Sequence, residues 1–108
     1  MIGAFLLLLA GSAEASQPNL NPVQEHSRCV NETAVRLVSS GEPASVLVDV
    51  AMTKCASAEG HALDWFMRTW KGDPQIAAIA RRNMGTELRR QAREDALVKV
   101  VEAKAKKN

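Results

Sequence analysis

Aromatic residues are scarce in this sequence of 108 residues, which contains no tyrosine, two tryptophans and two phenylalanines. Together with abundant alanine, this composition favours helices that pack through small side chains over a β-sandwich. The length is sufficient for one domain at most. A core of alanine, valine and leucine in so short a chain is thin, and small domains of this kind often depend on a cross-link or a partner.

Motifs that mark common enzymes are also missing. The chain has no G-x-S-x-G nucleophile elbow, no glycine-rich phosphate-binding loop and no C-x-x-C redox motif. Its acidic residues are spread along the outer faces of the expected helices, which is typical of solvated surface rather than of a paired general acid and base. The sequence therefore predicts a protein that is not an enzyme, with no catalytic residue and no cofactor.

Metal-binding residue types are few, and their spacing is unfavourable. His26 and Cys29 are three residues apart and could converge, but Cys55 and His61 are six apart, about 240° around a helix. Because a tetrahedral zinc site needs four converging ligands, no metal site is predicted. Both histidines are expected at the surface or at helix caps.

The N-terminal residues have the pattern of a targeting segment. An apolar run from Ile2 to Ala10 is followed by Ala13-Glu14-Ala15, an A-x-A cleavage pattern. The run is too short to span a bilayer as a helix. We interpret residues 1–15 as a secretory signal peptide cleaved before Ser16, which predicts a periplasmic or secreted protein. Because no Lys or Arg precedes the apolar run, three alternatives stay open: an uncleaved anchor, a start further upstream, and a buried helix of a cytosolic protein.

The rest of the chain divides into a leader and one helical domain. Residues 16–21 are polar with Pro18, and we expect a disordered leader there. Residues 22–108 form the predicted helical domain. Asn21 is suited to cap its first helix, because Pro22 fits the first helical position.

Cys29 and Cys55 lie at equal distances from a predicted turn. The turn is the Ser-Ser-Gly-Glu-Pro sequence of residues 39–43, and its centre at Glu42 is the midpoint between the cysteines. In an antiparallel hairpin, residues equidistant from the turn lie at the same height, here roughly 19 Å along each helix. Level sulfurs satisfy disulfide geometry, and an oxidising compartment favours the bond. The prediction is a disulfide-clamped antiparallel helical hairpin.

The apolar pattern gives each helix its limits. The first extends from Pro22 to about Ser39. The second begins at Pro43 and continues through Gly60, because the apolar positions beyond this glycine keep their phase. The sequence Lys-Gly-Asp-Pro at 71–74 is a helix stop followed by a restart.

A long basic third helix is predicted from Pro74 towards Lys106, and the fold class is all-α. The apolar face of this helix drifts in phase, so we expect it to bend near Gly85 or to leave the core in its last turns. The residues assigned to this face are Ile76, Ala77, Ala80, Met84, Leu88, Leu97, Val98, Val100 and Val101.

Charge is distributed unevenly along the chain. Residues 16–73 carry a net charge of −2, whereas residues 74–108 carry +5. The third helix is therefore the predicted contact surface for an acidic protein or an anionic membrane. A solvated helix whose basic end complements its dipole is the simpler alternative. The candidate contact residues are Arg81, Arg82, Arg89, Arg90, Arg93, Lys99, Lys104, Lys106 and Lys107.

The segment at residues 42–55, EPASVLVDVAMTKC, carries a resemblance. It is similar to a pattern in small, uncharacterised exported α-helical proteins of proteobacteria, in which a Glu-Pro-Ala start leads into an Ala/Val-rich helix that ends in cysteine. The resemblance implies an exported helical hairpin, and it transfers no activity and no functional residue.

The sequence thus predicts a small exported helical protein with a non-enzymatic role in protein interaction, or a chaperone-like role. A binder of anionic membrane surfaces through the basic third helix is the alternative. A cytosolic nucleic-acid binder is the weaker alternative, and it requires that residues 1–15 are not a signal peptide.

Overall fold

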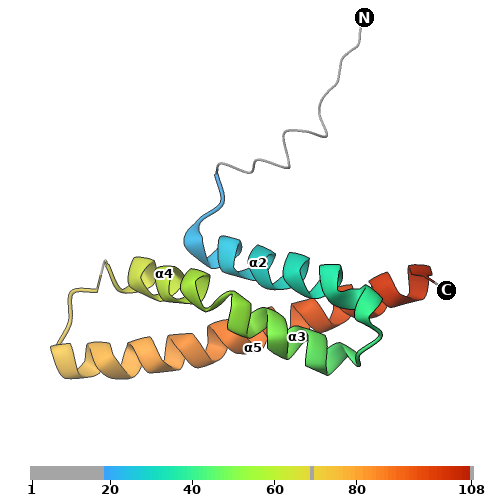
Figure 1. Cartoon of the computed structure of the whole chain (residues 1–108). Helices are drawn as coiled ribbons and strands as arrows, with labels where there is room; N and C mark the ends of the chain where they lie inside the picture. The colour runs from blue at the N-terminus through green and yellow to red at the C-terminus, as the bar shows by residue number, and fades with distance from the viewer. Residues whose placement is uncertain (1–18, 69, 108) are drawn as a thin grey trace, which may run out of the picture.

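The computed structural model describes residues 19–68 and 70–107, which form helices joined by short connections (Figure 1). The elements in chain order are α2 (Pro22–Arg36), the 3-10 helix η1 (Leu37–Ser40), α3 (Ala44–Lys54), α4 (Ala56–Met67) and α5 (Pro74–Lys107). These described residues contain no strand, so the all-α class is confirmed. The predicted signal peptide and residues 16–18 of the predicted leader lie outside the described residues. None of the described helices is both long and apolar enough to cross a membrane.

Local side-chain chemistry sets the helix ends. At the start of α2, Asn21 Oδ1 accepts a hydrogen bond from the Gln24 amide at 2.8 Å, and Gln24 Oε1 accepts one from the Asn21 amide at 3.0 Å. Gly41 ends the η1 turn with a positive φ of 83°, which favours glycine. At the start of α5, Asp73 Oδ1 accepts from the Gln75 amide at 2.7 Å. The Asn21 cap was predicted, and the other two ends lie in the predicted turn at residues 39–43 and at the predicted stop and restart at residues 71–74.

The hairpin and its disulfide are confirmed. Cys29 on α2 is bonded to Cys55, and their Cα atoms are 6.0 Å apart. The second helix is nevertheless two helices, because the chain makes a turn at Cys55 between α3 and α4. The interruption is slight, since the Cys55 amide still donates to the Ala51 carbonyl at 2.9 Å. Gly60 lies inside α4, so the predicted continuity through this glycine was right.

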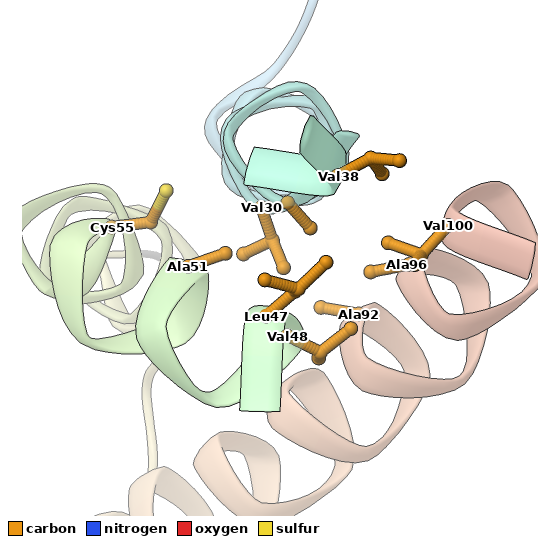
Figure 2. Close-up of a cluster of buried hydrophobic side chains, with 10 residues drawn as sticks. Val30, Val38, Leu47, Val48, Ala51, Cys55, Ala92, Ala96 and Val100 are labelled. Carbon is orange, nitrogen blue, oxygen red and sulfur yellow. The ribbon is translucent and has the colours of Figure 1, made fainter. Parts of the chain in front are cut away.

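Small apolar side chains from three helices form the main core (Figure 2). Leu47 is its largest aliphatic side chain, and four alanines allow the helices to approach closely. The cluster comprises Val30, Ala34, Val38, Leu47, Val48, Ala51, Cys55, Ala92, Ala96 and Val100.

The inward face of α5 differs from the prediction. Its buried hydrophobic side chains are Leu88, Ala92, Ala96 and Val100, spaced four residues apart. The helix is uninterrupted at Gly85, and the burial of Val100 shows that its distal half still reaches the core. Ile76, Val98 and Val101, which were assigned to the core face, are instead exposed. The prediction assigned large apolar residues to the buried face of α5, whereas small alanines make the close contacts between α5 and the other helices of the core.

Candidate functional site

An open groove lies between α2 and the C-terminal half of α5. Its volume is about 410 Å³, and it is lined by Asn31, Glu32, Val35 and Arg36 on α2 and by Lys99 on α5. Residues three and four apart share a side of a helix, which explains why the four α2 positions, at 31, 32, 35 and 36, line one wall. Val35 is 38% exposed and gives the groove an apolar surface.

The groove carries positive charge. The Glu32 carboxylate lies 3.9 Å from Arg28 Nε, one helical turn away. Arg36 donates to Thr33 Oγ1 at 3.4 Å. Within residues 19–68 and 70–107, neither Arg36 nor Lys99 forms an ion pair. Two cations are therefore available at the rim of an apolar depression, a combination that suits an acidic segment with an apolar side chain.

Asn31 connects the groove to a second network. Its side-chain nitrogen Nδ2 donates a hydrogen bond to Asp95 Oδ2 at 2.8 Å, which connects α2 to α5 beside the groove. Its Oδ1 atom is buried and has no hydrogen-bond partner among the described residues. The contact between Asn31 and Asp95 was not predicted from the sequence, because no local pattern indicates a contact between residues so far apart in the chain.

Three of the candidate contact arginines on α5 are bonded to carboxylates of neighbouring helices. The pairs are Arg81 with Asp64 and Arg89 with Glu59, both on α4, and Arg93 with Asp49 on α3. The N–O distances in the first two pairs are 2.9 and 2.7 Å. These arginines therefore link α5 to the hairpin, and their charge is largely compensated.

Arg90 is bound within α5 itself. It forms ion pairs with Glu87 and with Glu94, one turn away on either side. Its hydrogen bond to Glu87 raises the pKa of the guanidinium, and the same contact lowers the pKa of the Glu87 carboxyl. The Arg90 charge is compensated locally and does not add to a free basic surface.

The remaining candidates are Arg82, in the first half of α5, and four lysines towards the C-terminal end of this helix. Among the described residues, Arg82, Lys99, Lys104 and Lys106 form no ion pair. The Lys107 side chain lies outside the described part of the structure. Among the candidates whose side chains the structure describes, the basic residues are not gathered into one face, and Lys99 alone lines the groove.

His26 is fully buried, so the expectation that it lies at the surface or at a cap was wrong. It lines a second recess of about 210 Å³ between α2 and α5, with Val23, Ser27, Leu88, Gln91, Ala92 and Asp95. Neither imidazole nitrogen has a hydrogen-bond partner within the described residues. The Ser27 hydroxyl donates to Asp95 Oδ2 at 3.5 Å, so serine and histidine do not form a nucleophile–base pair. His61 is exposed, as predicted.

Burial lowers the pKa of His26, since the charged imidazolium is poorly solvated inside the protein. The Glu59 carboxylate opposes this effect and the Arg89 guanidinium adds to it. Folding therefore favours the neutral form of the imidazole ring over the charged form.

Acidification is expected to destabilise the protein through His26. Between the lowered folded pKa and the ordinary value of 6.5, the unfolded chain binds more protons than the folded one. Stability is thus complete above this window and falls as the pH drops through it, by up to about 1.4 kcal/mol per pH unit. Urea unfolding of the wild type and of His26→Leu, from about pH 8 to about pH 5, measures this loss. His61→Leu is the control, and it should keep the full pH dependence; equal slopes for the wild type and His26→Leu would contradict the assignment.

No protein-family model, no curated protein and no solved structure matches the chain. What the protein binds is therefore inferred from its own side chains.

Proposed function

We propose that this is an exported, non-enzymatic interaction protein that holds an acidic segment of a partner protein in the groove between α2 and α5. The observation that carries the proposal is the groove itself, in which exposed Val35 lies beside two cations without ion pairs among the described residues, Arg36 and Lys99. The Cys29–Cys55 disulfide is consistent with an oxidising compartment and so supports export.

An acidic protein segment fits these residues better than an anionic membrane does. A helix that binds a membrane surface needs a free apolar face flanked by free cations. The continuous apolar stripe of α5 is instead occupied by the core, through Ala92, Ala96 and Val100. The aliphatic side chains that this helix exposes lie in two separate pairs near its ends, and they do not form one continuous apolar face. Its arginines at positions 81, 89 and 93 are bonded to carboxylates. Basic side chains without ion pairs among the described residues lie mainly in the groove and near the C-terminal end of α5.

Binding of a fluorescent peptide of alternating leucine and glutamate tests the proposal. We expect measurable binding that weakens with salt, because the charges that meet are exposed. The double variant Arg36→Glu/Lys99→Glu should weaken binding by at least about tenfold, since two attractive contacts become repulsive. Fluorescence anisotropy titrations measure both effects.

Two controls make the result specific. Lys54→Glu changes an exposed charge on α3, away from the groove, and should leave the affinity unchanged. A peptide with glutamine in place of glutamate should bind more weakly than the acidic one. Equal affinity for both peptides would contradict the proposal, and flotation with anionic but not neutral vesicles would favour the membrane alternative.

A further inference from the structure

The outward face of α5 carries four aliphatic side chains that no other described element covers. Ile76 and Ile79 are 51% and 45% exposed near its N-terminus, and Val98 and Val101 are 55% and 57% exposed near its C-terminus. These positions lie on the side of the helix opposite to the core positions such as Ala92. Exposed aliphatic pairs at both ends of one long helical face mark a surface that gains free energy when covered.

Charged residues occupy the middle of the same face. Glu87 and Arg90 lie between the two aliphatic pairs, at angles around the helix close to those of Ile76 and Val101. Both are about half exposed, with side-chain exposures of 46% and 50%. Along its length, this face therefore has an apolar pair near the N-terminus of α5, charged residues in the middle and a second apolar pair near the C-terminus.

This order is complementary to itself when one copy is reversed. In an antiparallel pair of identical helices, residues equidistant from the two-fold axis lie at the same level. An axis between Leu88 and Arg89 is the common midpoint of three pairs: Ile76 with Val101, Ile79 with Val98, and Glu87 with Arg90. Aliphatic side chains thus meet aliphatic ones at both ends, and opposite charges meet twice in the middle.

We propose that two copies of the protein associate through this outward face of α5, antiparallel and around a two-fold axis. The second copy is the occupant that the charge order selects. Reversal of the helix sets the Glu87–Arg90 ion pair of one copy against that of the other, with Glu87 beside the partner's Arg90 and Arg90 beside the partner's Glu87, so the four charges alternate in sign. The contact extends over roughly 37 Å of helix from Ile76 to Val101. One helix face per copy is a small interface, so we expect a reversible dimer rather than an obligate one.

The dimer surface and the groove are separate surfaces. Lys99 of the groove lies about 140° around α5 from Ile76, so a dimer leaves the groove accessible. Failure of peptide binding would therefore not affect the dimer proposal, and a monomeric protein would not affect the groove.

Sedimentation equilibrium of the oxidised chain over a range of concentrations tests the proposal. The wild type should show a monomer–dimer equilibrium. Ile79→Glu and Val101→Glu should each raise the dimer dissociation constant by at least about tenfold, because each change occurs twice in a two-fold pair. Val46→Glu, a change at an apolar position on α3 that is 39% exposed, is the matched control and should leave the constant unchanged. Circular dichroism verifies that every variant is folded.

A charge-reversal experiment examines the pairing directly. Glu87→Arg and Arg90→Glu each bring like charges together in a homodimer, so each variant alone should be more monomeric than the wild type. A mixture of the two variants restores opposite charges at both contacts and should dimerise. A photo-cross-linking residue at Val98 should then capture the partner near Ile79, as found by mass spectrometry. A wild type that stays monomeric, variants without effect, or cross-links to the partner's own residue 98 would overturn the proposal.

Discussion

The double substitution Cys29→Ala/Cys55→Ala is expected to lower the free energy of unfolding by roughly 3.5 kcal/mol. The bond closes a loop across a sequence separation of 26 residues and so restricts the unfolded chain. The core that remains is thin, since alanine and valine supply most of it. A domain whose total stability is commonly about 5–15 kcal/mol would lose a large fraction of it. Urea unfolding followed by circular dichroism measures the loss.

Reduction of the wild type is the matched control for this substitution. It opens the same loop without removing atoms from the core apart from the bond itself, so the loss should be similar. A double variant that unfolds within about 1 kcal/mol of the oxidised wild type would show that the loop does not stabilise the fold as described.

Leu47→Ala is expected to lower the free energy of unfolding by about 3 kcal/mol. Leu47 is 2% exposed and lies in the cluster where α2, α3 and α5 meet (Figure 2). Its truncation leaves a cavity that the surrounding small side chains cannot fill. Chemical unfolding measures the effect, and an unchanged slope with denaturant confirms that the same transition is compared.

Val46→Ala is the control, because it removes methyl groups from the adjacent residue on the same helix. Val46 is 39% exposed, so its change should alter stability by no more than about 0.5 kcal/mol. If both variants lost the same free energy, the packing around Leu47 would not be the cause.

The sequence predicted the hairpin well because its signals are local or symmetric. The Asn21 and Asp73 caps depend only on neighbouring residues. The Cys29–Cys55 bond follows from equal distances to one turn, which needs no knowledge of the third helix. The turn at Cys55 was missed, because nothing in the Lys-Cys-Ala sequence there distinguishes an interruption from a continuous helix.

Features that depend on distant parts of the chain were not predicted. The count of basic residues on α5 gave no sign that Asp49, Glu59 and Asp64 would bind three of its arginines. The burial of His26 also depends on where α5 lies, because Leu88 and Ala92 line the same recess. Alanine occurs both in protein cores and on protein surfaces, so the alanines in the buried stripe of α5 could not be distinguished from exposed residues in the sequence.

The position of the disulfide also decides how the chain responds to a pull at its two ends. Tension passes directly from Cys29 to Cys55 through the sulfur atoms, so the residues between them carry no load while the bond is intact. The segment across the 26-residue separation therefore does not extend, and the fully stretched chain is shorter by about 90 Å than it would be without the disulfide. Because α4 and α5 lie outside this loop, a pulling force can extend them fully, whereas the hairpin turn and α3 stay inside the closed loop. An unfoldase that translocates the chain through a pore would have to accommodate two segments of chain side by side at this loop.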